Sequence, residues 1–156
     1  MLALAAMVLF AGVAHFRPSI ERSLGLNEQV AAVVRIVDGD TVVLSDGRFV
    51  RYLGIDTPEM TASGEHTRDL ARRATEANRK MVEGRKVRLE FDSVRKDKYG
   101  RTLAYVYCDG KCVNAELVAQ GFARAEFFRD NRRYLDEFKR LEAEAKSRRL
   151  GIWASE

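Results

Sequence analysis

The sequence predicts an α+β protein built on a five-stranded β-barrel of the Greek-key type, with about three α-helices and an apolar N-terminal segment. Three observations lead to this prediction. Short β-branched or alternating runs, separated by Asp-Gly pairs, recur between residues 30 and 108. One helical stretch interrupts these runs, and two more follow them. The chain has 156 residues, 46% of them hydrophobic and 32% charged, which suits one globular domain with its own core.

The first sixteen residues, MLALAAMVLFAGVAHF, form an apolar run without a formal charge. The run is shorter than the roughly 20 residues of a membrane-spanning helix, and Gly-Val-Ala at 12–14 would suit signal cleavage. No Lys or Arg precedes it, whereas Arg17 and Arg22 follow it, as they would beside a membrane anchor. We expect residues 1–16 to be a signal peptide of a secreted or periplasmic protein. An uncleaved membrane anchor is the alternative, and residues 17–29 read as a linker.

The domain itself, residues 30–156, begins with three strand-like runs. Residues 30–37, 41–44 and 48–55 are rich in Val, Ile and aromatic residues, and an Asp-Gly pair separates each run from the next. Asp-Gly between apolar runs is a hairpin signal, because Gly accepts a positive φ. These runs therefore predict a three-stranded meander.

The rest of the domain continues in helices and two more strands. Residues 66–83 carry apolar side chains at helical spacing and end at a glycine, so they predict a helix. Residues 86–92 and 101–108 predict strands, and helices are expected after Asn114 and from about 131 to 149. Three strands, a helix, two strands and then helices is the order of an OB-type barrel.

Two cysteines, Cys108 and Cys112, flank Asp-Gly-Lys at the third hairpin. If they faced each other across the strand pair, their Cα separation of roughly 4.5–5.5 Å would suit a disulfide. An exported protein could use such a bridge to lock the hairpin. Two free thiols are the alternative, expected if the protein is not exported.

Three carboxylates stand at the ends of neighbouring predicted strands. Asp40 precedes one strand, while Asp56 and Glu59 flank Pro58 just after the next. Asp-Gly and Asp-Thr are ordinary turn sequences, so either corner by itself predicts only a turn. Together, however, the two corners present hard oxygen ligands of the kind that Ca²⁺ or Mg²⁺ prefers.

Two arginines share the alternation of apolar rows. Arg51 is in phase with Phe49 and Leu53, and Arg101 is in phase with Leu103. A guanidinium in a core row is costly unless it reaches an anion or the barrel mouth, although either one alone could extend to solvent.

A cation and two guanidiniums are what phosphodiester cleavage requires, because they stabilise the charge that develops on the phosphoryl group. A carboxylate such as Glu59 could then orient or deprotonate the attacking water. The net charge of +4 and the pI of about 9.2 agree with a polyanionic partner without proving one.

Four stretches, IVDGDTVVL, RYLGIDTPE, DKYGRTLAYVY and DGKCVNAELVAQGFA, resemble those of the staphylococcal-type thermonuclease family. The resemblance covers roughly residues 30–153, in order and with matching spacing, including the ending LGIW. It implies a calcium-dependent nuclease that hydrolyses phosphodiester bonds of DNA and RNA. Water attack would expel the 5′ oxygen and leave 3′-phosphate ends. We expect the substrates to be single-stranded or frayed and the protein to be a monomer. Residues 1–16 could also tether the enzyme to a membrane.

The same resemblance implies a role for each matching position, with Asp38 supporting the metal indirectly. The implied roles are metal binding by Asp40, Asp56 and the Thr57 carbonyl; catalysis by Arg51, Glu59 and Arg101; and nucleic-acid contact by Lys98, Tyr99 and Phe127. Phe127 and Arg129 stand where the family's reference member has two tyrosines, so base stacking is retained at 127 without a phenolic hydrogen bond.

A non-catalytic nucleic-acid-binding OB module is the alternative function. Such a module should have lost some of the charged residues of the site. All five are present in this sequence: Asp40, Arg51, Asp56, Glu59 and Arg101.

Overall fold

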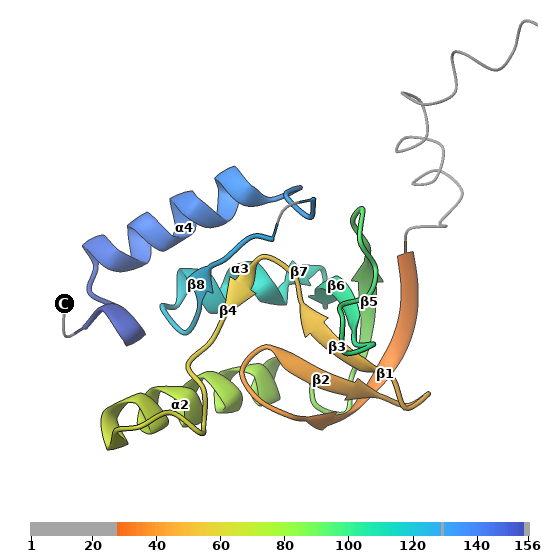
Figure 1. Cartoon of the computed structure of the whole chain (residues 1–156), viewed down its shortest axis with the longest axis horizontal. Coiled ribbons are helices and arrows are strands. Elements are labelled where there is room, and N and C mark those ends of the chain that lie inside the picture. The colour runs from red at the N-terminus through yellow and green to blue at the C-terminus, as the bar shows by residue number, and fades with distance from the viewer. Residues whose placement is uncertain (1–27, 129, 155–156) are drawn as a thin grey trace, which may run out of the picture.

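The structure is a computed structural model that describes residues 28–128 and 130–154, and it confirms the predicted barrel (Figure 1). The strands of the barrel pair in the order β3-β2-β1-β5-β6, and a parallel pairing between β3 and β6 closes the sheet on itself. Their bounds are β1 (Glu28–Ile36), β2 (Thr41–Leu44), β3 (Phe49–Tyr52), β5 (Lys86–Glu90) and β6 (Thr102–Cys108).

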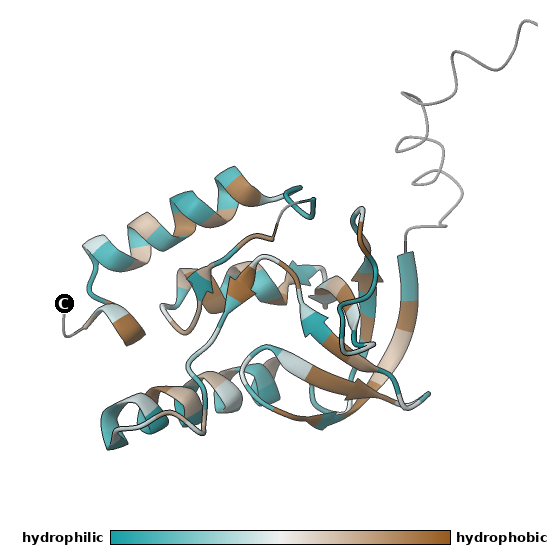
Figure 2. Cartoon of the chain, in the orientation of Figure 1, coloured by the Kyte–Doolittle hydropathy of each residue, from teal (hydrophilic) through white to brown (hydrophobic). Residues whose placement is uncertain are grey.

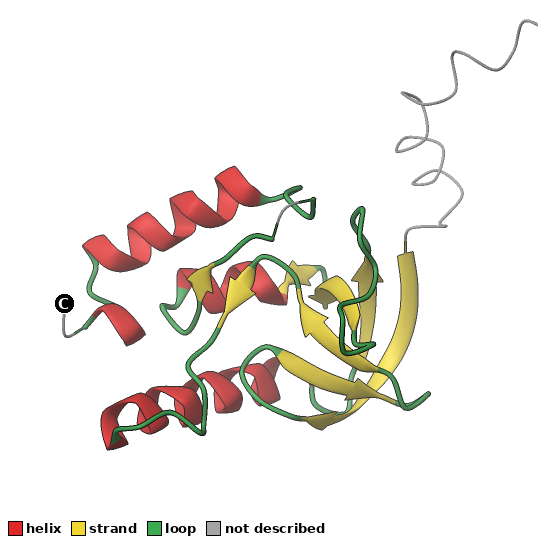
Figure 3. Ribbon diagram, viewed as in Figure 1, coloured by secondary structure: helices red, strands yellow, loops and turns green. Residues whose placement is uncertain are grey.

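In the described part of the chain, three α-helices and a short 3-10 helix accompany the barrel. They are α2 (Glu65–Val82), α3 (Val113–Ala119), α4 (Leu135–Ser147) and η1 (Gly151–Trp153). Figure 3 shows α2 and α4 beside the strands, with α3 between them. The last helix begins later than the predicted residue 131, because the Asn131 side chain instead bonds the backbone N–H and carbonyl of Val94.

The run 48–55, predicted as one strand, divides into two. Gly54, at a φ of +75°, turns the chain between β3 and β4 (Ile55–Asp56). β4 leaves the barrel and pairs antiparallel with β8 (Arg124–Ala125) in a small second sheet. This division matters for function, because Arg51 and Asp56 fall on opposite sides of the turn.

The interior of the barrel consists of apolar side chains from every strand. Figure 2 shows apolar residues concentrated in these strands, whereas α4 alternates between apolar and polar residues, as expected of a helix with one buried face. The fully buried interior includes Val33, Val42, Leu44, Val50, Val87, Leu89, Ala104 and Val106.

The predicted placement of Arg51 in the core row of its strand is wrong. Val50 and Tyr52 are the buried residues of β3, whereas Phe49 is 44% exposed. The Arg101 side chain is 34% exposed and stays close to water. The Arg51 side chain is 14% exposed, and carboxylates compensate its charge in place of water.

The predicted disulfide is wrong, because both cysteines are free thiols. Asp109 and Gly110, at φ values of 49° and 78°, form a two-residue turn before β7 (Lys111–Cys112). That turn pairs Cys108 with Lys111 and Cys112 with Tyr107, so the two cysteines are not opposite each other.

The expectations for residues 1–16, and those for the linker up to residue 27, lie outside the described residues. β1 already begins at Glu28, so the last two residues of the expected linker belong to the barrel. Among the helices that the structure describes, none is long and apolar enough to cross a membrane.

Candidate active site

Asp40 connects the two acidic corners that the sequence singled out. Its carboxylate is 5% exposed, and Oδ2 accepts hydrogen bonds from both the backbone N–H and the hydroxyl of Thr57, each at 2.9 Å. Gly39 allows this approach, because a Cβ there would lie 2.8 Å from the Thr57 hydroxyl. The corner before β2 and the corner after β4 are therefore in direct contact.

Arg51 joins the barrel to β4. Its Nε lies 3.1 Å from Asp40 Oδ1, and one of its terminal nitrogens lies 2.9 Å from Asp56 Oδ1. The other terminal nitrogen donates to the carbonyls of Tyr52 and Ile55, both at 2.8 Å. One guanidinium thus bridges two carboxylates and closes the turn between β3 and β4.

Negative charge is concentrated around this guanidinium. Burial, followed by the charge of Asp40, raises the pKa of Asp38 to about 6. Burial also raises the pKa of Asp56, with Arg51 opposing and the charges of Asp40 and Glu59 reinforcing the rise. A cation beside Asp40 and Asp56 would relieve this repulsion.

The oxygen ligands at this site suit a hard cation only when a backbone carbonyl is counted with the carboxylates. In residues 28–128 and 130–154, no three Asp, Glu, His or Cys side chains converge to hold a metal. Asp40 and Asp56 supply carboxylate oxygens, and the adjoining Thr57 can add its carbonyl, which is the kind of mixed oxygen set that Ca²⁺ accepts. Glu59 is exposed and lies outside this pair.

Asn78, which the sequence analysis missed, supports the corner from behind. This fully buried residue of α2 accepts a hydrogen bond from the Tyr52 hydroxyl at 2.8 Å and donates one to the Asp38 carbonyl at 3.0 Å. The available signal was an amide in the apolar stripe, four residues after Ala74. A polar residue in such a stripe needs buried partners.

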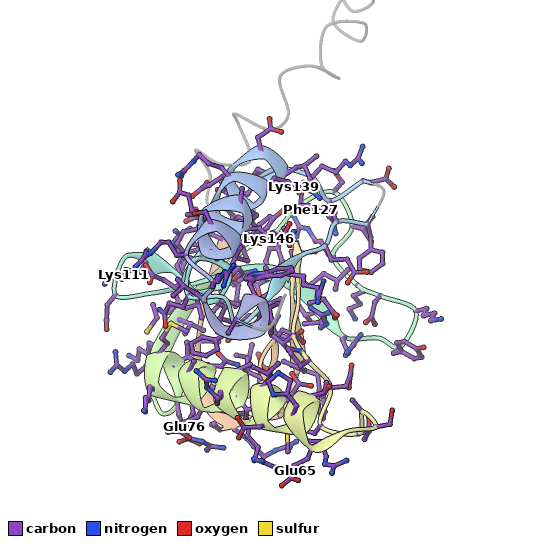
Figure 4. The ribbon with its side chains drawn as sticks, turned by 90° about the vertical axis from the view of Figure 1, so that its left-hand side faces the viewer. Glu65, Glu76, Lys111, Phe127, Lys139 and Lys146 are labelled. Atoms are coloured by element: carbon purple, nitrogen blue, oxygen red, sulfur yellow. The ribbon has the colours of Figure 1, made fainter. Side chains whose placement is uncertain are left out.

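Replacing Asn78 with alanine should lower the free energy of unfolding by about 3 kcal/mol, because a buried hydroxyl and a buried carbonyl both lose their partner. Urea denaturation would measure the loss. Glu76→Ala, on the exposed surface of the same helix (Figure 4), is the matched control and should change stability by less than about 0.5 kcal/mol. Equal losses in the two variants would refute the role assigned to Asn78.

Arg51 and Arg101 line the same pocket, which has a volume of about 480 Å³. Lys98 and Tyr99 lie on its rim, and Tyr99 is 72% exposed. The Tyr99 ring lies 5.0 Å from the Lys98 ammonium and 5.6 Å from the Arg101 guanidinium, measured to the ring centroid. The structure therefore brings four of the predicted site residues together around one cationic pocket.

Phe127 does not line this pocket. Its ring packs against Phe138 of α4, with centroids 5.7 Å apart, and lies close to Gly54, where an added Cβ would be 2.8 Å from it. The neighbouring Phe128 lines the pocket instead and is 67% exposed. Adjacent residues of an extended segment point in opposite directions, so Phe128 faces this pocket while Phe127 packs against α4.

Asp97 organises the loop that presents Lys98, Tyr99 and Arg101. One carboxylate oxygen accepts the backbone N–H groups of Tyr99 and Arg101, each at 2.9 Å, and the other lies 2.6 Å from Arg101 Nε. Burial acts to raise the pKa of Asp97, but the hydrogen bonds from Arg101 and Tyr99 outweigh it and lower this pKa. The carboxylate form is thus what holds Arg101 at the pocket.

Asp97→Asn should reduce stability at neutral pH and have no effect in acid. The pKa of Asp97 in the folded protein lies below its ordinary value of 3.8. Its contribution to folding is therefore complete above pH 3.8 and disappears as the pH falls through the lowered value. Urea denaturation of both proteins over this range would measure the difference, and a difference that grew on acidification would contradict the assignment.

Asp56 and Thr57 line a second pocket together with Glu59, separate from the one that contains the arginines. The predicted site residues are thus divided between two pockets. Asp40 joins them, because one of its oxygens meets Arg51 and the other meets Thr57. Chemistry at this junction would have access to both pockets.

Comparison with known proteins agrees with this arrangement. A family model described as "Staphylococcal nuclease homologue" matches residues 49–155. The chain is 36% identical over 140 residues to a thermonuclease of Staphylococcus hyicus, covering 86% of this chain and 83% of that protein. It is 38% identical over 124 residues to a thermonuclease of Staphylococcus intermedius, covering 78% and 74%.

A longer relative shares the same region. The chain is 46% identical over 125 residues to the SPbeta prophage-derived endonuclease YokF of Bacillus subtilis (strain 168). The match covers 77% of this chain but only 42% of that protein. The family match extends over more than half of the chain and includes most of the residues that line the two pockets. It therefore confirms the resemblance noted in the sequence. The chain belongs to the staphylococcal nuclease family.

Proposed function

We propose that this protein is a calcium-dependent endonuclease that hydrolyses phosphodiester bonds in DNA and RNA. The observation that carries the proposal is the convergence of Arg51 and Arg101 on one pocket, beside the carboxylates of Asp40 and Asp56. Relatives that are named thermonuclease or endonuclease support an activity on nucleic acids.

In this proposal, the arginines bind the phosphate and Glu59 acts on the attacking water. Arg51 and Arg101 bind the phosphate and neutralise the charge that develops on its oxygens. Glu59, exposed beside Asp56, takes a proton from the attacking water. Expulsion of the 5′ oxygen would then leave a 3′-phosphate end. The exposed rings of Tyr99 and Phe128 stack on bases, which favours single-stranded or frayed substrates.

Asp40, Asp56 and the Thr57 carbonyl would hold the calcium ion. When bound, the ion supplies positive charge to the phosphate and lowers the pKa of a nearby water. Arg51 already lies between the two carboxylates, so its guanidinium keeps them close together in the absence of the ion. This preorganisation limits the structural change that binding requires.

Cleavage of single-stranded DNA and RNA oligonucleotides by the purified protein, with Ca²⁺ or with a chelator, tests the proposal. We expect cleavage only with Ca²⁺, and mass spectrometry of the products should show 3′-phosphates. Cleavage that persists in chelator would reject the metal, and 3′-hydroxyl products would reject the bond assigned. Binding without cleavage under any divalent ion would favour the non-catalytic module.

Export to the periplasm or the medium is a separate proposal, supported only by the sequence of residues 1–16. Cell fractionation with an antibody would locate the protein, and recovery in the membrane fraction would favour the anchor. We also propose a monomer. Light scattering coupled to gel filtration should give the mass of one chain, 17.7 kDa, or less after signal cleavage.

A further inference from the structure

The second pocket, about 380 Å³ in volume, lies across Asp56 from the arginine pocket. Ile55 lines the arginine pocket and Asp56 lines the second one. Successive residues of a strand point to opposite faces, so β4 forms the wall between the two pockets. The volume of the second pocket is comparable with that of the arginine pocket, which is about 480 Å³. Each of the two is large enough for a small organic ligand.

Arg124 brings positive charge to the second pocket at the level of Asp56. The pairing of β4 with β8 places Arg124 opposite Asp56. Its guanidinium lies 4.5 Å from the ring centroid of Trp153, a residue that is only 2% exposed. Stacking on a buried ring fixes the plane of the guanidinium, and a guanidinium carries several N–H groups along its edge that suit oxygen acceptors of a ligand.

The remaining lining combines apolar and hydrogen-bonding groups. Leu70 of α2 and Ile152 of η1 contribute apolar surface, and the exposed His66 contributes an imidazole. Figure 4 views the side of the molecule that carries the start of α2, where Glu65 is labelled. An apolar surface beside a guanidinium and an imidazole matches the sugar, base and phosphate of a nucleotide.

We infer that the second pocket binds the nucleotide on the other side of the scissile phosphodiester from the one in the arginine pocket. The bond that an endonuclease cuts joins two nucleotides. These two nucleotides must extend in different directions from the scissile phosphate at the arginine centre. With one in the arginine pocket, the other crosses Asp56, where Arg124 donates to oxygen atoms of its base or sugar. This inference rests on the proposed nuclease function.

Arg124→Met tests the inference, because methionine keeps an apolar side chain over Trp153 and removes only the charge. Three substrates are compared in Ca²⁺: the dinucleotide TpT, thymidine 3′-methyl phosphate and thymidine 5′-methyl phosphate. Each ester keeps one nucleoside of the dinucleotide. We expect KM for TpT to rise about tenfold, the loss typical of one charge-assisted hydrogen bond. For the ester that occupies only the arginine pocket, KM should be unchanged.

Two control variants, a binding measurement and a folding check complete the test. Arg140→Met, at an exposed position of α4, removes the same charge elsewhere and should leave every KM unchanged. His66→Ala, also exposed, should raise KM for TpT about threefold. Fluorescence anisotropy with a labelled oligothymidylate in chelator should show weaker binding by Arg124→Met, and thermal unfolding should confirm that each variant is folded.

The outcomes separate this inference from the proposed function. An unchanged KM for TpT in both Arg124→Met and His66→Ala, or equal rises in KM for both methyl esters, would overturn the second subsite. If the wild-type protein cleaved none of these substrates or a longer oligonucleotide, the proposed function would fail. The binding measurement in chelator would then still decide whether Arg124 contacts nucleic acid.

Discussion

Arg51→Ala should reduce the rate of phosphodiester cleavage about 10³-fold, because it removes a preorganised charge from the phosphate site. Arg51 is 14% exposed in its side chain and already contacts Asp40 and Asp56. Alanine also leaves the buried Asp40 carboxylate without its ion pair, so the free energy of unfolding should fall by about 3 kcal/mol in metal-free protein. Single-turnover cleavage and urea denaturation would measure the two effects.

Ca²⁺ should restore part of the stability that Arg51→Ala loses, since the ion would compensate the charge of Asp40 and Asp56, but it should not restore the rate. Arg48→Ala is the matched control, because Arg48 is an arginine of the neighbouring turn that pairs with Asp46 at the surface. That variant should keep nearly full activity. A comparable loss of rate in both variants would mean that Arg51 acts only through general positive charge.

Asp40→Asn should nearly abolish calcium-dependent cleavage, with a loss of at least about 10³-fold, because a neutral amide replaces a carboxylate ligand. The amide cannot replace both carboxylate oxygens as acceptors. One oxygen of Asp40 accepts two bonds from Thr57, and the other lies beside Arg51 and Thr41. Turning an NH₂ toward either set of donors should also cost about 2 kcal/mol of stability.

Isothermal titration with Ca²⁺ would separate metal binding from catalysis in Asp40→Asn. Asp46→Asn is the control, because Asp46 is an exposed aspartate of the neighbouring hairpin, which pairs with Arg48 at the surface. Its calcium affinity and cleavage rate should equal those of the wild type. Undiminished calcium affinity in Asp40→Asn would remove Asp40 from the proposed ligand set.

The periodic elements could be predicted because local patterns determine them. Alternation identified the barrel strands, and the apolar stripe of α2 was correct to within a residue at each end. The two acidic corners stood out only in combination, because either one alone predicts a turn, whereas the two together present oxygen ligands that suit a hard cation. Two features were not predicted, namely the break at Gly54 and the two-residue strand β8, because a strand that short has no periodicity.

The expectations for the Arg51 row and for the disulfide were wrong, because local patterns decide neither the enclosed face of a strand nor the register of a hairpin. Alternation shows which residues of a strand share a face, but not which face the barrel encloses, so Arg51 was assigned to the core row. The family resemblance assigned nucleotide contact to Phe127, and in the structure the neighbouring Phe128 lines the pocket with the arginines. At the hairpin, a two-residue turn set a register in which Cys108 pairs with Lys111.

The sequence by itself determined the barrel, its helices and the residue types of a phosphodiesterase site, because these depend on short-range periodicity and on chemical identity. Only the tertiary structure decided how they meet. Asp40 and Thr57 are 17 positions apart, and Asn78 is 40 positions from Asp38. Contacts at such separations arise when the barrel closes and α2 packs behind it. The division of the site into two pockets by β4 follows from that packing.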